Sequence, residues 1–152
     1  MKPVVDIVVI SLISPLKVGV YKDNQLIKKH VSQEYTSDAL PIIFKNILEN
    51  FTCRRVFFAR GPGSFMAIKI TYIFLKTLSI SKKIELFGCD GFNFNNNSPI
   101  KASRKMYFVK KDDKIETQFF DQEQTCEFIL PKVVELKNFT KDIEPLYILP
   151  AV

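Results

Sequence analysis

The chain has 152 residues, 47% of them hydrophobic, so it can bury one core and form one domain, with at most a small appendage. Its 22 basic and 16 acidic residues give a net charge of +6, which suits an acidic partner or RNA but identifies neither. Asp6, Lys69 and Lys76 interrupt the apolar runs. None of these runs reaches the ~20 residues of a membrane helix, and we therefore expect no membrane contact.

The cysteine and histidine content argues against most metal sites. Cys53, Cys89 and Cys126 are far apart and odd in number, which disfavours a disulfide framework or a zinc site and favours the reducing cytoplasm. The only histidine, His30, is expected to face solvent from a strand. A metal site built on paired histidines is excluded.

The first part of the chain predicts three antiparallel strands, at residues 4–13, 17–21 and 25–32, with a hairpin turn at Asp23 and Asn24. A helix follows, because apolar residues recur at helical spacing in the stretch that comes next. Its predicted buried stripe consists of Leu40, Ile43, Phe44, Ile47, Leu48 and Phe51. Its predicted outward residues are Ile42, Lys45, Asn46 and Glu49.

A glycine-rich loop lies between the next strand, at 55–59, and a second helix, at 65–80. Gly61 and Gly63 permit backbone angles closed to other residues, Pro62 fixes one φ, and Ser64 is a good N-cap. A rigid loop at a helix N-terminus, here Arg60 to Ser64, can receive an anion, a phosphate or another chain, but a simple chain reversal has the same pattern. The P-loop and dinucleotide-binding patterns are both absent.

The second helix is apolar on nearly every side, unlike an ordinary surface helix. Helical periodicity predicts a core face made of Ala67, Ile70, Phe74 and Leu78. The opposite face carries Phe65, Lys69, Tyr72 and Lys76, with Ile73 beside them. We expect one face of this helix to pack on the chain's own sheet and the other face to pack on a partner. The alternative is a central helix that is covered on all sides by its own chain.

A strand at 83–87 completes the order βββαβαβ. This order predicts an α/β fold in which helices flank a mixed sheet. It is the half-domain layout of actin-like (ASKHA, RNase H-like) proteins. Residues 88–98 are predicted to form a loop, followed by a hairpin at 106–110 and 115–120. A strand at 132–136 and an extended end at 142–148 complete the prediction. We expect an N-terminal half-domain at 1–98 and a reduced, dependent unit at 99–152, the truncated second half.

The segment Arg60 to Ile70 reads Arg-Gly-Pro-Gly-Ser-Phe-Met-Ala-Ile-Lys-Ile, and it closely resembles Gly-Arg-Gly-Pro-Gly-Ser-Phe-Thr-Gly-x-Arg-Ile-Gly of the bacterial TsaB (YeaZ) family. Glu34-Tyr35-Thr36 and Leu40-Pro41 are similar to the Glu-His-Thr and Leu-Pro of the family's first helix. Glu144-Pro145-Leu146-Tyr147 is similar to its terminal Pro-x-Tyr-x-Arg. Order and spacing agree over most of the first ninety or so residues.

The resemblance implies an actin-like fold without an enzyme's active site and without a cofactor of its own. TsaB proteins act as scaffolds for the related TsaD, which transfers threonylcarbamoyl to adenosine beside the tRNA anticodon, with the ATPase TsaE as third member. Their two helices form the pairing surface for a TsaD heterodimer or, without TsaD, a homodimer. ATP, Mg and tRNA are accordingly expected to bind to the complex. The interface expected here consists of Phe65, Lys69, Tyr72, Ile73 and Lys76 with Ile42, Lys45, Asn46 and Glu49.

The departures from related enzymes favour a non-catalytic role. Actin-like enzymes hold phosphate and metal with an acidic residue just after the first strand, where this chain has Ser11-Leu12-Ile13-Ser14, and Asp6 comes too early. Lys101-Ala102-Ser103 replaces the family's Asp-Ala-Arg. Two alternatives remain open: an autonomous actin-like nucleotide-dependent enzyme, or a small RNA-binding module. The densest basic region is made of Lys101, Arg104, Lys105, Lys110 and Lys111.

Overall fold

A five-stranded mixed sheet forms the centre of the computed structural model, which describes residues 1–148. The sheet has the order β3-β2-β1-β4-β5. β1 pairs with β2 and β2 with β3 in antiparallel fashion, whereas the β1–β4 and β4–β5 pairs are parallel. The strands are β1 (Val4–Ile10), β2 (Leu16–Lys22), β3 (Gln25–Ser32), β4 (Thr52–Ala59) and β5 (Glu85–Cys89). The predicted α/β class with a mixed sheet is confirmed.

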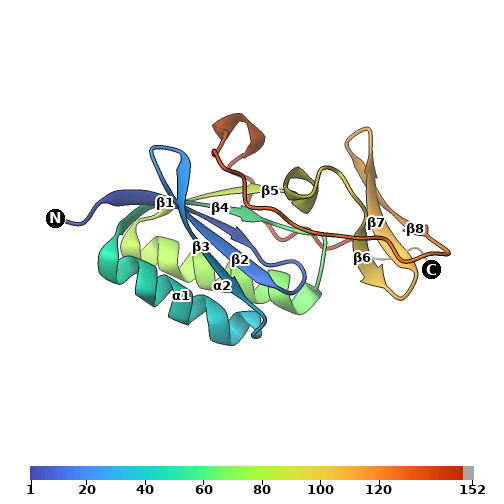
Figure 1. Ribbon diagram of the computed structural model, residues 1–152, viewed down its shortest axis with the longest axis horizontal. Coiled ribbons are helices and arrows are strands. Elements are labelled where there is room, and N and C mark those ends of the chain that lie inside the picture. The colour runs from blue at the N-terminus through green and yellow to red at the C-terminus, as the bar shows by residue number, and fades with distance from the viewer. Residues whose placement is uncertain (149–152) are drawn as a thin grey trace.

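Two helices, α1 (Thr36–Asn50) and α2 (Phe65–Lys82), lie side by side on one face of this sheet (Figure 1). Val5, Ile7 and Val9 alternate along β1 and point into the layer between sheet and helices, because successive side chains of a strand face opposite sides. The rings of Phe44 and Phe74 meet edge to face at 5.3 Å where the helices touch. Each apolar side chain buried in this layer stabilises the fold by about 2 kcal/mol.

The C-terminal third covers the other face of the sheet. A second sheet has the order β6-β7-β8, formed by β6 (Ile100–Ser103), β7 (Met106–Lys111) and β8 (Lys114–Phe119), and the chain then runs back across the first sheet (Figure 1). A buried cluster there combines residues from both predicted units, among them Val8, Ile10, Phe57, Ile100, Phe108, Phe128 and Val134. Residues 149–152, the end of the predicted C-terminal unit, lie outside the described residues.

Several predicted boundaries are wrong. The first strand ends at Ile10, because the chain leaves the sheet at Ser11, whose hydroxyl lies 2.7 Å from the Thr36 hydroxyl. The strand predicted from 83 begins at Glu85, since Lys83 takes a left-handed conformation that ends α2. The predicted loop at 88–98 contains the short 3-10 helix Gly91–Phe94.

The hairpin predicted at 106–110 and 115–120 is confirmed by the antiparallel pair β7 and β8. The other strand predictions after residue 98 are wrong, because little periodicity marks this part of the sequence. β6 was not predicted at all. The strand expected at 132–136 is absent from the described residues, where Val133 forms an isolated bridge with Gln25 and a 3-10 helix spans Leu136–Asn138. Here the structure depends on contacts with the first sheet.

Candidate interaction surface

The orientation of α2 differs from the predicted one. The residues of α2 that are buried against the sheet are Ile68, Thr71 and Leu75. The predicted core face is therefore wrong in part: Phe74 and Leu78 only partly enter the core, and Ala67 and Ile70 are half-buried. A helix with apolar residues on almost all sides gives periodicity little power to fix its rotation.

Eight of the nine residues predicted to form an interface are exposed. Three of them are large apolar side chains, and Phe65, Ile73 and Ile42 are 45%, 53% and 64% exposed. The lysines 69, 76 and 45 are exposed, as are Asn46 and Glu49, whereas Tyr72 is half-buried. That a partner binds these residues stays a prediction.

A groove of 390 Å³ runs between the two helices on their outer side. Of the nine predicted residues, Ile73 lines it, and the structure does not bring the other eight into it. Its walls are otherwise made by Thr36, Ser37, Leu40, Pro41, Ile70, Phe74, Thr77, Leu78 and Ser81. Sequence reasoning also missed two highly exposed residues of α2, Met66 at 66% and Ile80 at 74%. Their spacing of seven residues on either side of Ile73 was the signal that could have found them.

The glycine-rich loop is filled by its own chain. A Cβ on Gly61, whose φ is 142°, would overlap the Leu146 carbonyl oxygen, and one on Gly63 would lie 2.6 Å from the Leu12 carbonyl oxygen. The Ser64 N–H donates to the same Leu12 oxygen at 2.8 Å, and the Ser64 hydroxyl caps α2 by accepting from Ala67. Contacts within the chain therefore account for both glycines.

Arg60 fastens the C-terminal segment beside this loop. Its Nε donates to the Glu144 carbonyl oxygen at 2.8 Å, and its guanidinium lies 3.2 Å from the Asp142 carboxylate. The ring of Tyr147 then meets Phe65, at the start of α2, with centroids 5.4 Å apart. The C-terminal segment thus adjoins the predicted interface.

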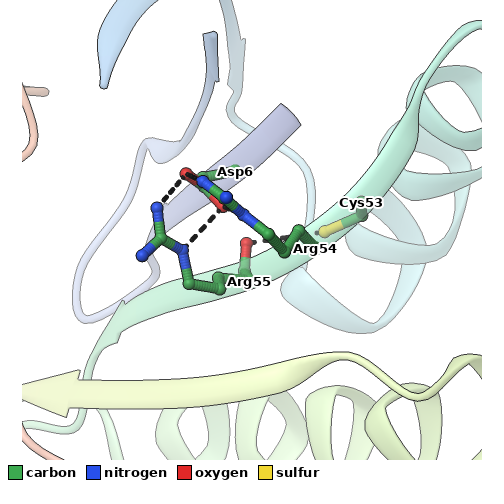
Figure 2. A network of polar contacts seen from close by, with 4 residues as sticks. All are labelled: Asp6, Cys53, Arg54 and Arg55. Atoms are coloured by element: carbon green, nitrogen blue, oxygen red, sulfur yellow. Dashed lines mark hydrogen bonds and ion pairs between the residues drawn. The ribbon is translucent and has the colours of Figure 1, made fainter. Parts of the chain in front are cut away.

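A buried ion cluster, which the sequence did not reveal, joins β1 to β4. Figure 2 shows the Asp6 carboxylate held by the guanidinium groups of Arg54 and Arg55. The closest contacts to its Oδ2 are 3.1 Å from Arg54 and 2.7 Å from Arg55. Val5 pairs with Cys53 and Asp6 with Arg55, so Arg54 is the extra residue of a bulge, and both arginines reach the same carboxylate.

The two arginines set the charge state of Asp6. Burial acts to raise the pKa of this carboxyl group, but the hydrogen bonds and charges of Arg55 and Arg54 outweigh burial and lower the pKa below its usual 3.8. Both oxygens of the carboxylate are engaged. Asp6 is therefore a structural anion and not a free base or metal ligand.

The position after β1 carries hydroxyl groups in place of a carboxylate. A cavity of 330 Å³ opens there beside the first turns of both helices, lined by Ser11, Ser14 and Ser64 among others. Glu34 is the one acidic side chain among its lining residues. Within residues 1–148, no three histidine, cysteine, aspartate or glutamate side chains are grouped so as to hold a metal ion.

The remaining predicted features concern His30, the segment at 101–103, the cysteines and membrane contact. His30, expected to face solvent, is half-buried in β3, and no described group bonds its buried Nε2. Lys101-Ala102-Ser103 forms part of β6. Burial raises the pKa of the Cys53 and Cys89 thiols to about 12, which keeps both unreactive. No helix in the described part of the chain has the length and hydropathy needed to cross a membrane.

Comparison with solved structures identifies the fold. YeaZ from Pseudomonas aeruginosa superposes with a TM-score of 0.59 at 10% sequence identity, covering 82% of this chain and 66% of that one. The chain has the fold of YeaZ. An uncharacterized protein with similarity to peptidase YeaZ from Pseudomonas aeruginosa gives a TM-score of 0.53 at 11% identity, with coverage of 78% and 64%. No protein-family model and no curated protein matches the chain.

The YeaZ comparison confirms the TsaB (YeaZ) resemblance at the level of the fold, and with it the predicted actin-like architecture. Identities of 10% and 11% support the fold alone. The chain spans just under two thirds of the length of the two YeaZ-like structures. Shared activity, partners and substrates are therefore matters for proposal.

Proposed function

We propose that this protein is a non-catalytic scaffold that pairs with a TsaD protein through the outer face of α1 and α2, and so supports threonylcarbamoyl transfer to tRNA. The observation that carries the proposal is the exposure of large apolar side chains on paired helices of a YeaZ fold, with Ile42, Ile73 and Ile80 each more than half exposed. Exposed apolar surface of this kind is costly in water and is typical of protein interfaces.

The described residues also offer little to a reaction carried out by this chain alone. The Asp6 carboxylate is occupied by two arginines, and the glycines of the loop are packed against Leu12 and Leu146. In the proposed complex, ATP and Mg bind to the catalytic partner, tRNA binds to the assembled pair, and TsaE joins as the third member. The protein acts in the cytoplasm, where tRNA is modified.

Size-exclusion chromatography with light scattering, on the chain alone and mixed with TsaD from the same organism, tests this proposal. We expect a 1:1 complex at micromolar concentrations. Ile73→Asp should weaken it at least tenfold, because a desolvated, unpaired carboxylate at an interface costs several kcal/mol. Tyr72→Asp should act in the same direction. Since Ile73 is 53% exposed, the substitution should leave the fold intact.

Ile129→Asp is the matched control. Ile129 is 56% exposed, and its N–H donates to the carbonyl oxygen of Phe94, which belongs to the cluster on the face of the sheet opposite to the helices. This substitution should leave the complex unchanged. The absence of any complex with TsaD, with and without ATP, would overturn the proposed function. An Ile73→Asp variant that still co-elutes with TsaD would show that the interface lies elsewhere.

A further inference from the structure

The outward side of α2 carries a stripe in which apolar residues alternate with lysines. Met66, Ile73 and Ile80 are 66%, 53% and 74% exposed and are spaced seven residues apart. Lys69 and Lys76 lie between them at spacings of three and four, so all five share one face of the helix. This face points away from Ile68, Thr71 and Leu75, which are buried.

No acidic residue of α2 balances the positive charge of this stripe. The sequence of α2 contains three lysines and no aspartate or glutamate. Among residues 1–148, neither Lys69 nor Lys76 takes part in any ion pair. A partner surface that covers the apolar residues must therefore approach uncompensated positive charges.

A second copy of the chain is a poor occupant for this stripe. Pairing α2 with α2 would place lysines near lysines as their surroundings lose water, which is unfavourable. The helix α1 offers two exposed acids, Asp38 and Glu49, with Lys45 between them. These acids are eleven residues or ~16 Å apart, whereas Lys69 and Lys76 are ~10 Å apart, so the spacings do not match.

We infer that the α2 stripe selects a protein surface with acidic side chains ~10 Å apart beside an apolar ridge, and that it disfavours a second copy of this chain. The inference rests on the proposed function, since it specifies the chemistry of the partner at the same surface. The charges provide selectivity, and the exposed apolar residues provide most of the buried area.

The test compares the wild-type chain with a double charge-reversal variant, Lys69→Glu with Lys76→Glu, by calorimetric titration with TsaD. We expect the reversal to weaken binding at least tenfold. We also expect wild-type binding to weaken as NaCl rises from about 50 mM to about 300 mM. The matched control is Lys28→Glu with Lys29→Glu on β3, which changes the net charge equally at exposed positions and should leave binding unchanged.

Self-association is measured in parallel by light scattering. The wild-type chain should be monomeric at low salt, and an equimolar mixture of wild-type and charge-reversed chains should associate more strongly than either alone. One outcome would overturn this inference while the proposed function stands. In it, Ile73→Asp abolishes binding to TsaD, but the charge reversal and added salt leave that binding unchanged.

Failure of TsaD to bind at all would overturn the proposed function. The self-association of wild-type and charge-reversed chains, alone and mixed, would then be the test of the inference. The inference would be overturned if the wild-type chain formed a homodimer at low salt and Ile73→Asp disrupted that homodimer. Preferential association of wild-type with charge-reversed chains would support it.

Discussion

The Asp6 carboxylate illustrates how one buried charge can hold two strands in register. Its side chain is 2% exposed and receives hydrogen bonds from two neighbouring arginines, of which Arg55 is 15% and Arg54 55% exposed. Removing one partner from a buried ion pair costs more than forming the pair gains, because the remaining charge stays desolvated. Breaking the Asp6 cluster should therefore lower the free energy of unfolding substantially.

Asp6→Asn should lower the free energy of unfolding by about 3 kcal/mol at pH 7. The pKa of Asp6 is lower in the folded than in the unfolded state, so its contribution is present above pH ~4 and is lost as the pH falls through the folded-state pKa. The difference in the free energy of unfolding between Asp6→Asn and wild type should accordingly become smaller as the solution is made acidic. Urea unfolding followed from pH 7 to pH 3 measures both effects.

Glu85→Gln provides the control for Asp6→Asn. Glu85 also carries a pKa lowered by a partner, Lys141, but that pair is exposed at the sheet edge and is screened by solvent. Its replacement should change the urea midpoint much less. Equal midpoints for wild type and Asp6→Asn at pH 7 would contradict the structural role of the cluster.

At the scale of elements, the sequence predicted what depends on local patterns. The strand at 25–32 has the predicted bounds, and the Ser64 cap and the start of α2 follow from residue types that act locally. The face of α2 that packs on the sheet could not be predicted from hydrophobicity alone, because apolar residues lie on almost all its sides. Thr71 is buried while Met66 and Ile80 are exposed, a choice made by packing against the sheet and not by hydrophobicity. The Asp6 cluster depends on residues 48 and 49 positions apart and on a bulge, which leave no local signal.

The C-terminal segment is an element without regular structure that a few contacts hold in place. Thr140 exchanges two backbone hydrogen bonds with Gly88, and the Leu146 N–H donates to the Arg60 carbonyl oxygen at 3.0 Å. The Arg60 side chain adds contacts to Asp142 and Glu144. Local stability of this segment should therefore depend strongly on Arg60.

Arg60→Ala should loosen the segment without unfolding the sheet. We expect trypsin to cleave after Lys141 about tenfold faster, because the variant loses a charged hydrogen bond and an ion pair worth ~1.4 kcal/mol together. The urea midpoint should change little. Limited proteolysis followed by mass spectrometry gives the rate of cleavage at this site.

Lys101→Ala is the control for Arg60→Ala. It likewise removes one basic residue, which pairs with the exposed Glu123 at 3.5 Å, and it should leave cleavage at Lys141 unchanged. Cleavage at Lys141 that is equally slow in Arg60→Ala and wild type would show that the backbone contacts alone hold the segment.

At the scale of the whole molecule, the central sheet is buried on both faces by different parts of the chain. The helices cover one face, and residues that follow position 90 cover much of the other (Figure 1). The alternating β1 side chains supply both layers, since Val9 belongs to the helix side and Val8 to the opposite side. Such sharing predicts one cooperative unit, because neither layer can be lost without exposing apolar faces of the other.

Phe128→Ala tests this coupling. Phe128 is 4% exposed, and it belongs to the cluster that includes Val8 and Ile10 of β1 and Phe108 of β7. Its truncation should lower the free energy of unfolding by about 3 kcal/mol through lost burial and a residual cavity. Hydrogen exchange should then show reduced protection in β1 and β4 as well as in β7. If only residues 100–134 lost protection, the C-terminal third would unfold separately, and the sheet would be stable with that face uncovered.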